Sequence, residues 1–268
     1  IVATPFFIWM LLADGGGITD TAGDGVYTAV IPAQPHRTLI RYRILATDLS
    51  GNTVQVPSAS DPRKNFAAYS YNRIPTYTTG GTTYGPAALE SLPAYQGLTR
   101  ASDFSSLLAY NGADQFANTN ALGALEGRRN ENFVGTMVVG DQVLDHTAAR
   151  LRGGNSRYMG SGKRHFRFNF PKGTWLEARD ENGNKLKGKW ESLLFNKCFG
   201  NKGAYDFGLP YEVGAKLWSL QGVPMPESVF IHFRVVRDGD EQSATNGDFW
   251  GLYQALELPE GKNFLDAR

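Results

Sequence analysis

The sequence predicts an α+β protein in which strands dominate: a partial β-sandwich is followed by a mixed β-sheet domain with few helices. Three observations support this class. The chain has 268 residues, 41% of them hydrophobic, which is enough for a substantial core. Its 31 glycines and 13 prolines favour turns and short strands over long helices. Most apolar stretches alternate with a period of two, as strands with one buried face do.

Residues 1–58 are expected to form an antiparallel β unit that packs separately from the rest. Strands are expected in FFIWMLL, GVYTAVIPA, TLIRYRILATD and TVQVP. This rhythm is typical of an immunoglobulin-like β-sandwich, here without its first strands. The loop after the first strand contains Asp14, Asp20 and Asp24, whose spacing fails the pattern of a calcium-binding loop. Turn formation is therefore the favoured role of these residues, and a weak surface calcium site is the alternative.

Residues 59–90 are expected to be a linker packed on the surface, because Ser, Thr, Gly and Pro are frequent and several tyrosines can pack. The second domain is expected to span residues 91–268. Its strands are predicted in LPAYQGL, NFVGTMVVGDQVLDH, HFRFNF, SVFIHFRVV and DFWGLYQALEL. Helices are predicted in ASDFSSLLAYNG and LPYEVGAKLWSLQG, the second with Val213, Leu217 and Leu220 along one face. Four tryptophans are expected in the core: Trp175, Trp190, Trp218 and Trp250.

The net charge of +1 is unevenly distributed along the chain. Residues 150–200 contain twelve lysines and arginines against four acids, a net charge of +8, so the remainder carries −7. A field of this size attracts phosphate or a carboxylate-rich partner, and the alternative is a solvated basic face. The single cysteine, Cys198, excludes an internal disulfide and is expected to be a buried, inert thiol. The four histidines lack metal-ligand spacing, so no metal site is predicted among them.

The stretch RLRGGNSRYMGSGKRHFRFNF combines glycines, cations and an alternating aromatic strand. Glycines allow a loop to wrap closely around a ligand, and cations on the adjoining strand can meet phosphate oxygens. A Walker loop is excluded, because no GxxxxGK[ST] leads into a helix. Three interpretations compete: a phosphate cradle, a nucleic-acid surface, and a hairpin with a solvated face. Alternation predicts two faces, with Phe166, Phe168 and Phe170 on one and Lys163, His165, Arg167 and Asn169 on the other.

The same stretch resembles the signature of the CotH (spore coat protein H) kinase family. The resemblance extends through NFVGTMVVGDQVLDH before it and LEARDENGNKLKGKW after it, and continues in LPYEVGAKLWSLQGVPMP, SVFIHFRVV and GDFWGLYQALELPEGKNFLD. It covers the chain from about Leu92 onward, with several motifs in the same order. More weakly, residues 1–58 resemble the β-sandwich that often precedes such domains in large bacterial surface proteins.

The resemblance implies a kinase-like N-lobe and transfer of phosphate from ATP, with Mg, to serine on secreted proteins. It implies nucleotide-binding roles for Arg152, Gly153, Asn155, Ser156 and Lys163. Arg164 stands where a second lysine is usual in the family, which puts lysine-type geometry in doubt there. Arg167 is expected to rise from the adjoining strand toward the phosphates, and Glu212 to be the acidic partner of Lys163, although a surface Glu is an equal alternative. Glu257 is expected near a hinge to a second lobe.

The catalytic carboxylates of the family lie further along the chain, so their positions are unknown here and the fragment is expected to be inactive by itself. By family analogy, the protein acts outside the cell or at its surface. The expected partners are a nucleotide and a secreted protein substrate, with no nucleic acid and no membrane span. The alternative is a non-catalytic cell-surface module whose basic face binds acidic polymers or glycans.

Overall fold

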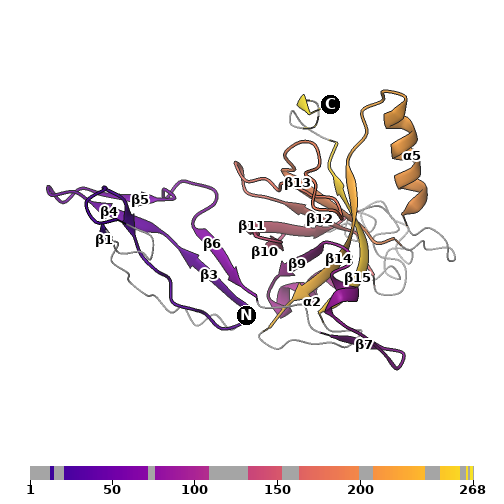
Figure 1. The fold of residues 1–268 in the computed structure, drawn as a ribbon, viewed down its shortest axis with the longest axis horizontal. Coiled ribbons are helices and arrows are strands. Elements are labelled where there is room, and N and C mark those ends of the chain that lie inside the picture. The colour runs from indigo at the N-terminus through magenta and orange to yellow at the C-terminus, as the bar shows by residue number, and fades with distance from the viewer. Residues whose placement is uncertain are drawn as a thin grey trace, which may run out of the picture.

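The computed structural model describes residues 13–14, 21–71, 76–108, 132–152, 163–198, 208–238, 248–259, 264 and 266–267. Strands dominate these residues and helices are few, in agreement with the predicted class. The indigo N-terminal unit lies on one side of a β-barrel, and helix α5 (Leu209–Leu220) lies on the other (Figure 1). Among the described residues, no helix is long and apolar enough to cross a membrane.

The centre of the molecule is a closed seven-stranded barrel with the strand order β10-β11-β12-β13-β15-β14-β9. Its strands are β9 (Ala94–Leu98), β10 (Phe133–Val139), β11 (Gln142–Leu151), β12 (Phe166–Asn169), β13 (Ser192–Asn196), β14 (Ser228–Val236) and β15 (Phe249–Glu257). All neighbouring pairs are antiparallel except β9 and β14, which run parallel and close the barrel. Every predicted strand after Leu92 is present, and β13 is a strand that the sequence pattern did not single out.

The barrel core is built from the side chains that point inward from the strands. Phe166, Phe168, Phe195, Phe233 and Tyr253 pack as a cluster of rings, with centroid separations from 4.8 Å for Phe168–Phe195 to 6.1 Å for Phe166–Tyr253. Most of these pairs are tilted or edge-to-face, which are favourable geometries for aromatic quadrupoles. The short helix α2 (Ala101–Leu108) contributes Phe104 and Leu107 to the same core.

The N-terminal unit consists of paired strands that do not enter the barrel sheet. Its pairs are β1 (Ala13–Asp14) with β2 (Tyr27–Thr28), β3 (Thr38–Tyr42) with β6 (Phe66–Ser70), and β4 (Ile44–Thr47) with β5 (Thr53–Val56). TLIRYRILATD is therefore two strands rather than one. Strand β6 comes from the segment predicted to be a linker, which also holds β7 (Tyr77–Thr79), β8 (Thr82–Tyr84) and helix α1 (Pro86–Leu89). FFIWMLL lies outside the described residues.

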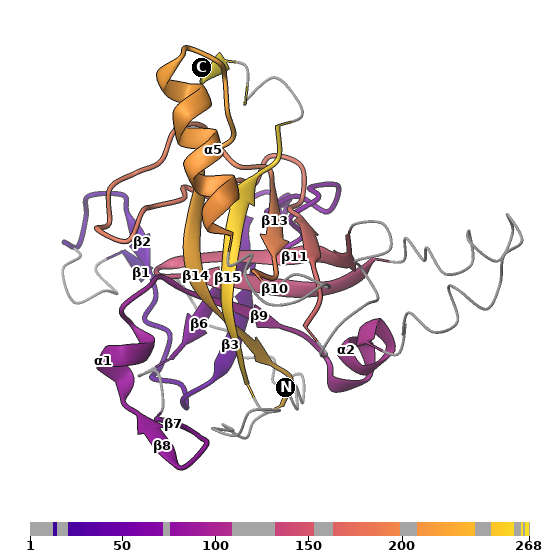
Figure 2. The same cartoon turned by 90° about the vertical axis from the view of Figure 1, so that its right-hand side faces the viewer.

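Helix α5 stands beside β14 and β15 (Figure 2). Unlike most amphipathic helices, it directs its apolar face away from the barrel. Val213, Leu217 and Leu220 share one face, as predicted, but that face is exposed, at 56%, 58% and 70%. The helix instead buries Ala215. Two of the tryptophans expected in the core are also exposed: Trp218 lies on this helix, and Trp175 stacks with the Lys189 ammonium, 4.0 Å from the ring centroid. Trp190 is buried as expected, and Trp250 packs against the core while partly buried.

Two glycines allow a matched test of the packing. A Cβ at Gly135 in β10 would lie 2.4 Å from the carbonyl oxygen of Leu98, a backbone atom of the neighbouring strand. Gly135→Ala should therefore reduce the free energy of unfolding by about 1–3 kcal/mol through forced strand displacement. Gly214→Ala in α5 meets open space and should stabilise the protein by up to about 1 kcal/mol. Urea denaturation of both variants measures the contrast, and equal effects would contradict the strand packing described here.

Candidate functional site

The candidate site is the basic end of the barrel, where β11 leads into the glycine-rich segment and β12 leads out of it. The ladder between these strands continues past Leu151 and Phe166, because the Arg152 amide donates to the His165 carbonyl at 3.1 Å. Arg152 and Lys163 thus flank residues 153–162. Those residues, with the predicted ligands Gly153, Asn155 and Ser156, lie outside the described part of the chain.

Strand β12 divides its side chains between two faces as the alternation predicts. Phe166, Phe168 and Phe170 are 1%, 5% and 9% exposed. Arg167 lies half-buried between them, and its Nε donates to Asn169 Oδ1 at 2.9 Å. It is paired across the ladder with Arg150. The strand therefore holds a fixed row of polar side chains over an aromatic core.

Arg152 and Arg167 lie on the same face of the β11–β12 ladder, and the charges of Arg167 and of Tyr211 on α5 both act on Arg152. Burial lowers the pKa of Arg152, Tyr211 opposes this effect, and the nearby charge of Arg167 adds to it. Burial also raises the pKa of Tyr211, and Arg152 opposes that shift. Two guanidinium groups on one face of the β11–β12 ladder are an arrangement that favours an anion with several oxygens.

Lys163 points toward a fork between two strands. The last paired residues of β13 and β15 are Asn196 and Gln254, and beyond them the strands separate. The Lys163 ammonium donates to the carbonyl of Leu252 on one side and to that of Lys197 on the other, the latter at 3.1 Å. It also lies 4.3 Å from the centroid of the Tyr253 ring. In this position the lysine joins the two strands where the ladder ends.

Burial is the main cause that lowers the pKa of Lys163 to about 8. The charge of Lys197 acts in the same direction, whereas Cys198 opposes it. The ammonium form still predominates at neutral pH, because its pKa remains above 7. Cys198 is buried, as predicted.

Glu212, in the first turn of α5, joins the helix to the outer face of the barrel. Its carboxylate accepts hydrogen bonds from the Ser228 hydroxyl and from Gln254 Nε2, the latter at 3.0 Å. Gly208, which precedes the helix with a φ of 83°, makes this close approach possible, since a Cβ there would lie 3.1 Å from Gln254 Oε1. Glu257 is buried at the end of β15, where it accepts a hydrogen bond from the Glu227 amide at 3.2 Å.

The structure thus gathers only some of the predicted site residues. Arg152 and Arg167 lie together, whereas the ion pairs among the described residues include none between Lys163 and Glu212. Gln254 and Tyr253, which contact these two side chains, were not anticipated from the sequence. The alternation of DFWGLYQALEL marks them as neighbours on opposite faces of one strand, which was the available signal.

The two carboxylates described above, Glu212 and Glu257, each accept hydrogen bonds from neighbouring groups. Within the described ranges, no three His, Cys, Asp or Glu side chains lie together as a metal would require. The magnesium implied by the family resemblance therefore finds no ligand set among these residues. Of the acidic N-terminal loop, Asp24 accepts a hydrogen bond from the Val26 amide at 2.8 Å, in keeping with a turn-forming role.

Comparisons with protein-family models, with curated proteins and with solved structures gave no match for this chain.

Proposed function

We propose that this chain is the nucleotide-binding part of an atypical, CotH-like protein kinase that phosphorylates serine on secreted or cell-surface proteins, preceded by a partial β-sandwich. The observation that carries the proposal is the shared face of Arg152 and Arg167 on the β11–β12 ladder, at the ends of the strands that flank residues 153–162 in the sequence. Two half-buried guanidinium groups on one face are suited to bind a triphosphate. The proposal assigns no catalytic carboxylate to the described residues.

The arginines also offer a sharper test than Lys163. Lys163 joins β13 and β15, so its replacement would disturb the barrel as well as any phosphate contact. Arg152→Ala and Arg167→Ala should each weaken ATP binding at least about tenfold, because a charge-assisted hydrogen bond contributes roughly 1.5–3 kcal/mol. Isothermal titration calorimetry with ATP at low salt measures this effect.

Lys172→Ala is the matched control, because it removes one positive charge from an exposed position just beyond β12. Under the proposal it leaves ATP affinity unchanged. If all three variants lose affinity equally, or if the intact chain does not bind ATP, the nucleotide site is wrong.

A second candidate function is binding of acidic polymers or glycans by a non-catalytic surface module. The observation that favours it is a set of exposed lysines within residues 172–189, one of which, Lys189, lies over the exposed ring of Trp175: Lys172, Lys185, Lys187 and Lys189. For this function, polyanion binding would fall steeply with salt, and the lysines would share the loss. The same Lys172→Ala variant therefore separates the two functions when it is titrated with ATP and with a polyanion.

A further inference from the structure

A β-bulge in the barrel turns two consecutive side chains toward the N-terminal unit. In the ladder of β10 and β11, Gly135 pairs with Thr147 and Met137 pairs with Leu144, so Thr136 alone faces Asp145 and His146. His146 has a φ of 53°, which is uncommon for a residue with a side chain. A bulge of this kind re-aims side chains that a regular strand would send to opposite faces. Asp145 and His146 therefore both reach the same neighbour.

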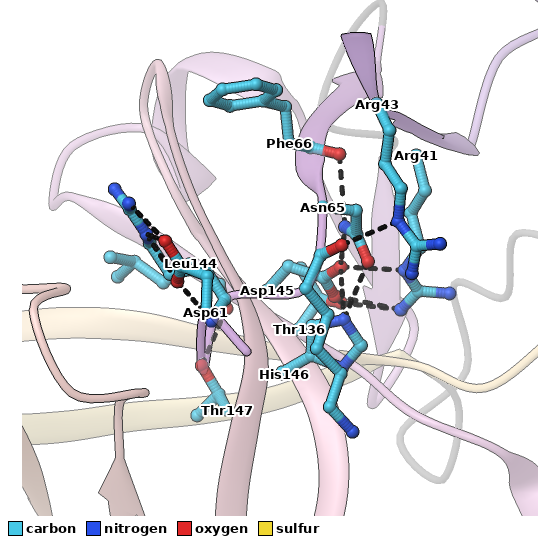
Figure 3. A network of polar contacts seen from close by, with 12 residues as sticks. Arg41, Arg43, Asp61, Asn65, Phe66, Thr136, Leu144, Asp145, His146 and Thr147 are labelled. Atoms are coloured by element: carbon cyan, nitrogen blue, oxygen red, sulfur yellow. Dashed lines mark hydrogen bonds and ion pairs between the residues drawn. The ribbon is translucent and has the colours of Figure 1, made fainter. Parts of the chain in front are cut away.

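Asp145 is the centre of a hydrogen-bond network that joins the two parts of the molecule (Figure 3). From the N-terminal unit, Arg41 donates to its two oxygens through Nε at 2.7 Å and Nη2 at 2.8 Å. Asn65, just before β6, donates through Nδ2 at 2.8 Å. From the barrel itself, the Thr136 hydroxyl donates at 2.6 Å. The side chain of Asp145 is only 6% exposed, so water has little access to the carboxylate, whereas the Arg41 side chain is 45% exposed.

His146 lies at the edge of this network, and its neighbours determine where its protons lie. Its Nε2 is 2.7 Å from Asn65 Oδ1 and 3.5 Å from Asp145 Oδ2. Because Asn65 uses its amide nitrogen to reach Asp145, its oxygen accepts from His146, and Nε2 carries the hydrogen. A second proton must then go to Nδ1 and make the ring a cation.

The charges around His146 come from each element packed against it. Arg41 belongs to β3, Arg43 lies between β3 and β4, and Lys64 lies in the turn before β6. Arg43 Nε donates to the Lys64 carbonyl at 2.7 Å, which keeps these two cations together. Asp145 is the acidic group among these neighbours, and Arg41 already occupies both of its oxygens. A charged His146 therefore adds a fourth cation to this interface.

We propose that the network around Asp145 is an acid-sensitive latch, in which protonation of His146 weakens the docking of the β3–β6 pair on the barrel. Opening of the latch returns His146 to water and separates it from Arg41, Arg43 and Lys64. The buried ion pair between Arg37 and Asp248 is a second attachment between the same two parts and contains no histidine. Acid thus loosens the attachment at Asp145 but not the one at Asp248, which changes how firmly the unit is held.

The titration behaviour of the network supports this direction. Burial lowers the pKa of His146 below its usual value of 6.5, Asp145 opposes the shift, and Arg41, Lys64 and Arg43 add to it. The docked state therefore binds this proton less readily than the open state, and docking weakens as the pH falls below about 6.5. Burial disfavours the Asp145 carboxylate, but the hydrogen bonds from Arg41, Thr136 and Asn65 outweigh it and hold its pKa far below the usual range. Asp145 thus stays ionised in this window, and the effect belongs to His146.

Hydrogen exchange measured by mass spectrometry on the full chain tests the latch, with rates corrected for the intrinsic pH dependence of exchange. Between pH 7.5 and 5.0, the amides of β3 and β6 should exchange faster through local opening, whereas those of β13 and β15 should not change. Each unit by which the His146 pKa lies below its open-state value corresponds to about a tenfold rise in the opening constant.

His146→Asn should remove the pH dependence while the unit stays docked, because asparagine tolerates the left-handed backbone and cannot become a cation. His146→Gly serves the same purpose if the asparagine variant does not fold. Asp145→Asn should raise opening at every pH in the range. The latch is refuted if the exchange of β3 and β6 in the natural chain does not respond to pH, or if it responds equally in the His146 variants.

Discussion

Replacing Asp248 by asparagine should lower the free energy of unfolding by about 3–5 kcal/mol, because removing one partner of a buried ion pair is strongly destabilising. Asp248 Oδ2 lies 2.6 Å from Arg37 Nη1 and 3.5 Å from Arg234 Nη2. The Asp248 side chain is 2% exposed, and those of Arg37 and Arg234 are 1% and 2% exposed. Water therefore has little access to this site and cannot solvate the two guanidinium groups when the carboxylate charge is removed. Equilibrium urea denaturation followed by tryptophan fluorescence gives the value.

The chain contains a control pair with the same geometry at the surface. Arg63 Nη2 and Asp61 Oδ2 are also 2.6 Å apart, but the arginine side chain is 49% exposed. Asp61→Asn should leave the free energy of unfolding nearly unchanged, because solvent screens such pairs. If the two substitutions have similar effects, burial is not what makes the Asp248 contact important.

Phe195→Ala should also lower the free energy of unfolding by about 3–5 kcal/mol, because it opens a cavity in the centre of the barrel. The Phe195 side chain is fully buried. Its ring centroid lies 4.8 Å from those of Phe168 and Phe233 and 5.7 Å from that of Tyr253. Thermal and urea denaturation of this variant measure the loss directly.

Leu217→Ala on α5 is the control for this core substitution. Leu217 is 58% exposed, so its truncation should change stability by no more than about 0.5 kcal/mol. A loss comparable to that of Phe195→Ala would mean that the exposed face of α5 is covered by other residues in solution. A small loss agrees with the orientation of the helix described here.

The strands were predictable where one face is buried, and less so elsewhere. HFRFNF alternates strictly and SVFIHFRVV largely does, and both are strands with most of their apolar residues buried. SLLFN, which forms β13, has four consecutive buried residues, and a run without alternation does not distinguish strand from helix. The orientation of α5 was also not predictable. Its apolar face suggests burial, but the polar contacts of Glu212 hold the opposite side against the barrel.

The site was predictable only as far as it depends on local sequence. The alternation of β12 placed Arg167 on the polar face and the phenylalanines beneath it. The fork that receives Lys163 depends on where β13 and β15 separate, and these strands are far apart in the sequence. The Asp145 latch and the Arg37–Asp248 pair likewise join distant segments. Side chains that meet only after the barrel has closed carry no signal in a single sequence.

The parallel pairing of β9 and β14 has a consequence for how the protein is made on the ribosome. Ala94, in the first barrel strand to be synthesised, pairs with His232 in the sixth. β9 can pair with β10 early, but its second neighbour emerges only after most of the domain has been translated. Until β14 and β15 are synthesised, the sheet stays open with two unpaired edges, at β9 and at β13, and joining segments so distant in sequence is intrinsically slow. This interval is when the nascent chain is most exposed to aggregation and most dependent on chaperones.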